Sequence, residues 1–222
     1  MLAILKESPL FRGLEPAEIE MLIKNTPHQF KQFTNKDVIA FSGEPVEKAM
    51  ILLEGRLQGE MSDFSGNRLK IEEIEPPQMV AAAFLYGPQS VFPVNLSSLS
   101  DGRLLMIFKK DFTLMLSREP RVLNNYLNII SAKAQFLSQK IIFLSYRTIR
   151  EKFAFFLLQR LKGDNSFIHI SQSQAEVAGL MGVARPSLAR TIGEMESKGI
   201  IRWNRNEVEV RDPKALNSIL GR

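Results

Sequence analysis

The feature that most constrains this chain is a strict heptad repeat of apolar residues in residues 121–144. The intervals alternate between four and three residues without a break, and the members are Leu123, Leu127, Ile130, Ala134, Leu137, Ile141 and Leu144. Such spacing keeps one narrow apolar seam on a helix whose other faces stay polar. The pattern predicts a long helix that pairs with a second copy of itself. The alternative is a helix that lies on the core of its own domain.

The composition excludes several kinds of chemistry. The chain has 222 residues, of which 45% are hydrophobic, and no cysteine. The length allows more than one domain, and the missing thiols exclude disulfides, a thiolate nucleophile and a cysteine-held iron–sulfur cluster. His28 and His169 lie far apart in the sequence, so a histidine metal site or triad is poorly supported. No nucleophile–base pair or pair of carboxylates converges on a motif, and we expect no enzyme.

The apolar runs of the chain are short. None approaches the roughly 20 residues that a membrane-spanning helix needs. Residues 1–10 also lack the basic region and the cleavage site that are typical of a secretory signal. We therefore expect a cytoplasmic protein.

The positive charge of the chain is unevenly distributed. Residues 145–222 contain 13 Lys and Arg against 8 Asp and Glu, whereas residues 1–144 contain 16 of each sign. All of the net charge of +5 therefore follows the heptad repeat. A basic segment of this kind favours a polyanionic partner such as DNA.

Between Phe30 and Phe112, short runs of β-forming residues alternate with turn signals. Strands at this spacing indicate an antiparallel sandwich or barrel, and Gly55 and Gly66 fall where tight turns need a positive φ. A polar break follows the heptad repeat and is typical of a hinge. We therefore expect an α+β protein in three parts, which are a β-rich domain at 1–118, a dimerisation helix at 119–145 and a basic domain at 146–222.

The most specific local pattern begins at Ser173. Ser173 and Glu176 form a capping box at the start of a helix that is expected to turn Leu180 inward, and Gly182 ends that helix. Residues 200–211 have the pattern of a β-hairpin. A second helix lies between Gly182 and the hairpin, and its buried face is expected to hold Leu188, Ile192 and Met195. Two helices, a glycine turn and a hairpin predict a winged helix-turn-helix.

In this motif the second helix enters the major groove of DNA, and its first residues meet base edges. The exposed side of that helix is expected to carry Arg185, Ser187 and Arg190. Arginine matches guanine through two parallel hydrogen bonds. Backbone phosphates are expected to meet the flanking polar side chains, which are Gln172, Gln174, Lys198, Arg202 and Arg205. The alternative is a winged helix that contacts protein.

The whole layout resembles the superfamily of bacterial transcription factors that includes the cyclic-AMP receptor protein and the fumarate–nitrate regulator (Crp/Fnr). The motifs that carry the resemblance are Gly43-Glu44, Ile51-Leu52-Leu53-Glu54-Gly55, Gly66, and the helix-turn-helix from Ser173 to Arg190. The resemblance implies an N-terminal antiparallel β-roll of the cyclic-nucleotide-binding type, the dimerisation helix and the winged helix. It also implies that Arg185 and Arg190 read bases. Pro186 stands where the family often has a base-reading Glu, so the operator is expected to be unusual.

The expected effector pocket departs from the cyclic-nucleotide-binding members. Ala82, Phe92 and Pro93 align with the Glu, Arg and Ser that hold ribose and phosphate in those relatives. Burying a phosphate without a cation is unfavourable, so the alignment predicts that cyclic AMP and cyclic GMP do not bind in the usual manner. The residues expected to line this apolar pocket are Met79, Val80, Ala82, Phe84, Phe92 and Pro93, with Leu137 and Ser138 from the dimerisation helix.

Two interpretations of this pocket stay open. One is a hydrophobic effector or a haem, as in the gas- and nitric-oxide-sensing branches of the superfamily, among which the hybrid-cluster-protein regulators are similar. The candidate iron ligands would then be Met61, Met79 and His28. The other interpretation is a filled pocket without any ligand.

The partners that follow from the resemblance are a pseudo-palindromic duplex operator, a second copy of the chain and, for an activator, RNA polymerase. The alternative class of function is a nucleotide- or protein-binding regulatory module without direct DNA readout. The two differ in salt dependence, because binding to DNA weakens steeply as salt rises.

Overall fold

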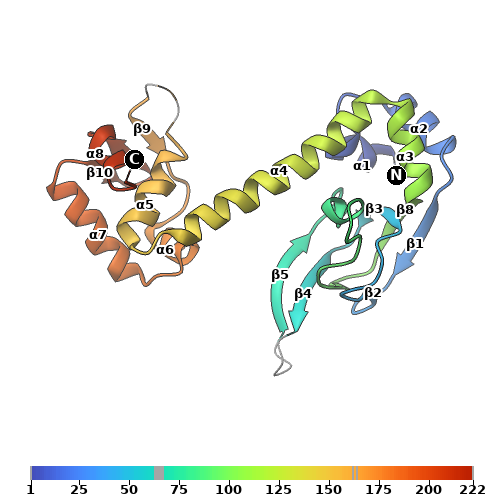
Figure 1. Cartoon of the computed structure of the whole chain (residues 1–222), viewed down its shortest axis with the longest axis horizontal. Coiled ribbons are helices and arrows are strands. Elements are labelled where there is room, and N and C mark those ends of the chain that lie inside the picture. The colour runs from blue at the N-terminus through green and yellow to red at the C-terminus, as the bar shows by residue number, and fades with distance from the viewer. Residues whose placement is uncertain (1, 63–67, 162, 164, 222) are drawn as a thin grey trace. The chain divides into compact units, whose positions relative to one another are not determined.

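The computed structural model describes residues 2–62, 68–161, 163 and 165–221. The chain divides into two compact units, residues 1–135 and 136–222, and each has its own hydrophobic core. The boundary between them falls inside the long helix α4 (Pro120–Ser145), which Figure 1 shows with the other elements along the chain.

Two antiparallel four-stranded sheets form the body of the first unit, in the orders β1-β8-β3-β6 and β2-β7-β4-β5. Their strands are β1 (Gln29–Phe33), β2 (Val38–Ala40), β3 (Lys48–Glu54), β4 (Leu57–Ser62), β5 (Arg68–Ile74), β6 (Met79–Val80), β7 (Asn95–Ser98) and β8 (Gly102–Phe108). The two central strands are buried on both faces, since residues 49–53 of β3 are all buried and both Leu104 and Leu105 of β8 are too. Leu52 and Leu104, paired across these strands, are fully buried.

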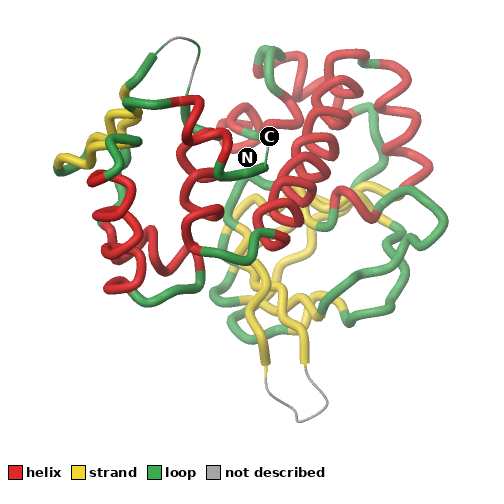
Figure 2. The backbone as a smooth tube through the Cα atoms, turned by 60° about the vertical axis from the view of Figure 1, so that its left-hand side comes forward, coloured by secondary structure: helices red, strands yellow, loops and turns green. Residues whose placement is uncertain are grey.

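The helices of this unit gather at one end of the strands (Figures 1 and 2). They are α1 (Leu2–Glu7), the 3-10 turns η1 (Pro9–Phe11) and η2 (Ala82–Phe84), α2 (Pro16–Lys24), α3 (Lys109–Arg118) and the first part of α4. Phe11 and Phe112 insert fully buried rings into the common core.

A glycine is required where β3 turns into β4. Gly55 has a φ of +85°, and a Cβ atom there would lie 2.5 Å from the carbonyl oxygen of Asp101. No other residue type fits without moving the backbone, which confirms the expected tight turn. Gly66, expected at the next turn, lies outside the described residues.

The first half of α4 lies on the core of the first unit through one face. Val122 and Tyr126 are buried, and the Asn125 amide donates hydrogen bonds to the carbonyl oxygens of Leu10 (3.0 Å) and Arg12 (2.8 Å). The heptad seam is largely a different face. Its side chains are exposed in the single chain except Ile130, which packs partly against this core.

The second unit is built around a three-stranded sheet of order β10-β11-β9. Its elements are the last part of α4, α5 (Ile149–Leu158), β9 (Phe167–His169), α6 (Gln174–Met181), α7 (Arg185–Ser197), β10 (Ile201–Asn204), β11 (Glu207–Val210) and α8 (Pro213–Ser218). Phe153, Leu157 and Leu188 are completely buried at the centre.

The expected inward orientation of Leu180 in α6 is wrong. Val177, Ala178 and Met181 are buried, whereas Leu180 is 55% exposed. At 3.6 residues per turn, Leu180 points about 100° away from the centre of the face that the three buried residues define. Its hydrophobic side chain therefore lies on the surface of the unit.

Among the described residues, no helix is both long enough and apolar enough to cross a membrane.

Candidate nucleic-acid interface

The turn between α6 and α7 is built by local hydrogen bonds and one glycine. The Ser173 hydroxyl accepts a hydrogen bond from the Glu176 backbone N–H at 3.3 Å, and the Glu176 carboxylate accepts one from the Ser173 N–H at 2.7 Å. This confirms the predicted capping box. The Ser173 hydroxyl also donates to the Glu176 carboxylate at 2.7 Å, and the two hydrogen bonds that Ser173 donates lower the pKa of Glu176. Gly182 then ends α6 with a φ of +68°. The capping box and Gly182 therefore define where α6 begins and ends, and so where the turn to α7 lies.

Helix α7 presents an open N-terminus to solvent. Ala184 stands at the N-cap and offers no side-chain acceptor, and Pro186 occupies the first turn. Leu188, Ile192 and Met195 are buried as predicted, and Arg185, Ser187 and Arg190 are exposed. The N-terminus of α7 therefore combines a positive helix end with the exposed Arg185, and Arg190 follows in the second turn, an arrangement that suits an anionic partner.

The second unit carries five exposed cations at and around α7 and the hairpin. They are Arg185, Arg190, Lys198, Arg202 and Arg205, and in the described part of the chain none of them forms an ion pair. By contrast, the nearby Arg211 donates to the Glu209 carboxylate at 2.9 Å. Unpaired cations keep their full charge for an external polyanion. Gln172 and Gln174 are both half-buried beside α6.

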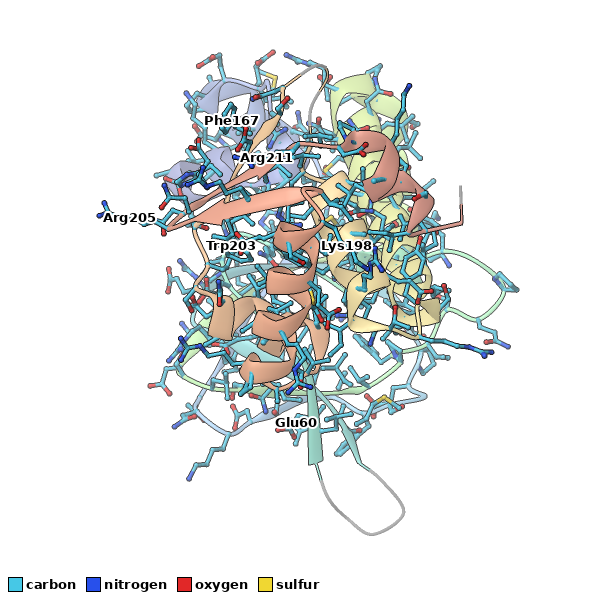
Figure 3. The ribbon with its side chains drawn as sticks, turned by 90° about the vertical axis from the view of Figure 1, so that its left-hand side faces the viewer. Glu60, Phe167, Lys198, Trp203, Arg205 and Arg211 are labelled. Carbon is cyan, nitrogen blue, oxygen red and sulfur yellow. The ribbon has the colours of Figure 1, made fainter. Side chains whose placement is uncertain are left out.

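The hairpin of β10 and β11 is tied to the helices by Trp203. Its ring stacks on Phe153 of α5 with centroids 5.7 Å apart and planes within 9°, and its backbone N–H donates to Glu196 of α7 at 2.8 Å. Its indole N–H donates to the carbonyl oxygen of Arg205 at 2.7 Å. Arg205 itself has a φ of +51° and projects from the tip of the hairpin in Figure 3.

Arg202 has a less favourable setting than Arg205. It pairs with Glu209 across the two strands, so a carboxylate shares its face of the sheet. We therefore rank Arg205 above Arg202 as a site for a phosphate. The roles of Glu196 and Trp203 were not expected from the sequence, because they depend on partners from other elements.

The residues expected to line the effector pocket do not share one environment. Val80, Ala82 and Phe92 belong to the core of the first unit, and Met79 packs partly against it. Phe84 and Pro93 are exposed. In the second unit, Leu137 and Ser138 are both exposed on α4. The set therefore contains both core residues and exposed residues.

The three candidate iron ligands differ in their surroundings. His28 donates from Nδ1 to the Thr26 carbonyl oxygen at 2.8 Å, and its ring meets Phe30 edge to face. Met61 is 50% exposed. In the part of the chain that the structure covers, no group of three or more His, Cys, Asp and Glu could hold a metal ion.

Comparison with known proteins agrees with this architecture. Residues 30–119 match the cyclic nucleotide-binding domain family, and residues 151–219 match the Crp-like helix-turn-helix domain family. The chain belongs to the Crp/Fnr superfamily, a family of transcription regulators rather than enzymes, and it carries a helix-turn-helix DNA-binding domain. The α+β fold class expected from the sequence, with its long helix, is confirmed.

The similarity to the relatives covers most of the chain. It is 23% identical over 218 residues to the cyclic AMP receptor protein of Thermus thermophilus, covering 97% of this chain and 98% of that protein. It is 23% identical over 201 residues to the transcriptional regulator SdrP of the same organism, covering 84% and 92%. Its fold matches the crystal structure of the Thermus thermophilus catabolite activator protein with a TM-score of 0.56 at 21% identity, over 96% of this chain and 98% of that one.

Proposed function

We propose that this regulator acts as a homodimer that reads a pseudo-palindromic operator. In each copy, the N-terminal turn of α7 enters the major groove, where Arg185, Ser187 and Arg190 meet base edges. Gln172, Gln174, Lys198, Arg202 and Arg205 contact the flanking phosphates. The observation that carries the proposal is the set of unpaired, exposed cations on α7 and the hairpin.

The homodimer rests on the exposed heptad seam of α4. Leu137, Ile141 and Leu144 are 57%, 68% and 63% exposed in the single chain. A line of large apolar side chains in water is covered when two such helices pair. In this proposal residues 119–145 form the dimerisation helix between a sensor domain at 1–118 and a DNA-binding domain at 146–222. RNA polymerase is a further partner if the regulator activates transcription.

The sensor domain is proposed to respond to something other than a cyclic nucleotide. Residues 79–93 contain no Lys or Arg, and Phe92 is 8% exposed where relatives that bind cyclic nucleotides need a cation. Isothermal titration with cyclic AMP should therefore show no binding at millimolar ligand. Saturable binding would overturn this part of the proposal.

DNA recognition is tested on an operator selected from random duplexes by the wild-type protein. R185A should lose about thirtyfold or more in affinity for that operator, because the homodimer loses one bidentate arginine–guanine contact in each half-site and each contact is worth about 1–3 kcal/mol. Fluorescence anisotropy of labelled duplex measures the change. K214A, which removes a charge from α8 in the same unit, is the matched control and should bind like the wild type. Equal affinity of R185A and the wild type would refute the assignment.

Salt titration separates the proposal from the alternative class of function. The logarithm of the affinity should fall linearly with the logarithm of the salt concentration, with a slope set by the number of phosphate contacts. R205A should make that slope less steep by about two units, one for each copy in the homodimer, while leaving sequence preference in place. Absence of DNA retention at low salt would favour a module that binds proteins or nucleotides.

A further inference from the structure

The second unit has a groove that is separate from the proposed DNA-contacting residues and from the heptad seam. It lies between the last turns of α4 and helices α5 and α6, entirely within residues 136–222, and has a volume of about 170 Å³. Phe143 and Phe155 line it, together with Phe136, which is 61% exposed, and Leu180, which is 55% exposed. Two large apolar side chains from different helices are thus left in water on either side of one groove.

The polar rim of this groove has one sign of charge. Lys140 of α4 and Arg160, just beyond α5, both line it, and no acidic residue does so among the described residues. The Arg160 guanidinium lies 3.7 Å from the centre of the Phe156 ring and donates to the Phe156 carbonyl oxygen at 3.1 Å. Neither cation forms an ion pair in the described part of the chain, so N–H donors remain available toward the groove.

The groove uses a face of α4 that the heptad seam does not. Phe136 and Phe143 are seven residues apart and one position before Leu137 and Leu144 respectively, so they form a separate stripe on the same helix. A molecule in the groove would therefore contact α4 without entering the proposed dimer seam. It would also contact α6, the first helix of the helix-turn-helix, through Leu180.

From this combination we propose that the groove binds a small carboxylate with an apolar body, such as an arylacetate. The carboxylate pairs with Arg160 and Lys140, and the apolar part covers Phe136 and Leu180. The volume sets the size, because a cavity of about 150 Å³ lined by apolar side chains accommodates a single benzene ring. Binding joins α4 to α6, and its influence on DNA affinity rests on the proposed function, whereas the binding itself does not.

Isothermal titration of the full chain with phenylacetate tests the site. Phenylacetate should bind with a dissociation constant of about 0.1–1 mM, as expected for so small a ligand. Phenylacetamide, which has the same shape but no charge, should bind at least about tenfold more weakly, because hydrogen bonds to charged groups are the stronger ones. Equal binding of the two, or no binding of phenylacetate at 5 mM, would overturn the proposal.

Variants locate the site on the chain. R160Q and L180D should each weaken phenylacetate binding by about tenfold or more, the first by removing the counter-charge and the second by placing a carboxylate in the groove. K214Q is the matched control, since it removes a charge on α8, and it should bind like the wild type. Circular dichroism verifies that each variant is folded. Full binding by a folded R160Q would place the ligand elsewhere and refute the site.

The link to DNA is a separate measurement. Saturating phenylacetate should change the operator affinity of the wild type, and operator DNA should change phenylacetate affinity by the same factor. R160Q should lose that coupling while its DNA affinity without ligand stays at the wild-type level. Binding without coupling would leave the site in place and refute its role in regulation, and a failure to bind DNA at all would refute the proposed function.

Discussion

Tyr126 is one of the residues through which α4 packs on the core of the first unit. Its hydroxyl donates to the Ala82 carbonyl oxygen at 2.8 Å, and its ring meets Tyr86 and Phe112 edge to face. Burial, with a smaller contribution from Tyr86, raises the pKa of Tyr126 to about 12 from an ordinary value of 10.0. The stability that the neutral phenol contributes is therefore complete below pH 10.0 and is lost as the pH rises toward about 12.

The alkaline loss is measured by urea unfolding between pH 9 and 12. Y126F should unfold more easily at neutral pH by about 1 kcal/mol, because the buried Ala82 carbonyl loses its donor. It should also show a smaller additional loss above pH 10 than the wild type, since the group that titrates is gone. An identical alkaline loss in Y126F would assign the effect to Tyr86 or Tyr146, the other tyrosines of the chain.

For single residues, the sequence predicts which side chains are exposed better than it predicts which distant side chains contact one another. The exposure of Arg185 and Arg190 follows from helical periodicity once Leu188 and Ile192 are taken as buried, and the structure agrees. The contact of Trp203 with Phe153 joins residues 50 positions apart. No local pattern encodes such a contact, because it depends on how α5 packs against the hairpin.

At the scale of the element, the turn between α6 and α7 rests on one backbone conformation. Gly182 has a φ of +68° and open space around it, so an alanine there is strained only through its backbone. G182A should lower the free energy of unfolding by about 1 kcal/mol. Urea unfolding followed by circular dichroism measures this.

Gly179 supplies the matched control. It lies inside α6, and a Cβ atom added there would also meet nothing within 4 Å, but its backbone is helical. G179A should therefore raise the free energy of unfolding by about 0.5–1 kcal/mol, because alanine is the better helix former. Changes of the same sign in both variants would contradict the assigned role of Gly182.

The starts of helices could be predicted where the sequence contains a capping box. The capping box at Ser173 predicted the start of α6 and is present, and a second capping box, between Thr148 and Glu151, begins α5. The orientation of Leu180 did not follow, because α6 is only 8 residues long and nearly all apolar, so two adjacent faces compete. The burial of Val80 and Phe92 in the core of the first unit did not follow from the sequence either, since packing density cannot be derived from residue type.

At the scale of the whole molecule, the heptad seam predicts the oligomeric state. I141E should produce a monomer at micromolar concentration, because two such helices would bury opposing carboxylates in an apolar seam. Analytical ultracentrifugation measures the change. Q135E adds a charge of the same kind on a polar face of α4 and should remain a dimer. A monomeric wild type, or a dimeric I141E, would contradict the proposed dimer helix.

The monomer should also bind DNA differently. With one recognition helix per particle, I141E can hold only one half-site at a time, so its affinity for the full operator should approach that for a half-site. The two half-site centres are expected to lie about 34 Å apart, one turn of the duplex.

The order of the domains along the chain was predictable because the basic segment, the heptad repeat and the capping motifs occupy separate stretches of the sequence. The effector to which the sensor domain responds was not predictable, since effector recognition depends on the shape of a cavity rather than on a local sequence pattern.

Trp203 is the single tryptophan of the chain, and it lies at the point where the hairpin rests on α5. Indole emission shifts with the polarity and stacking around the ring. The fluorescence of Trp203 therefore reports whether the hairpin of β10 and β11 is packed against α5. F153L should move the emission maximum to longer wavelength before any DNA is present. Addition of operator to the wild type should then give an unlabelled, real-time signal from the tip that carries Arg205.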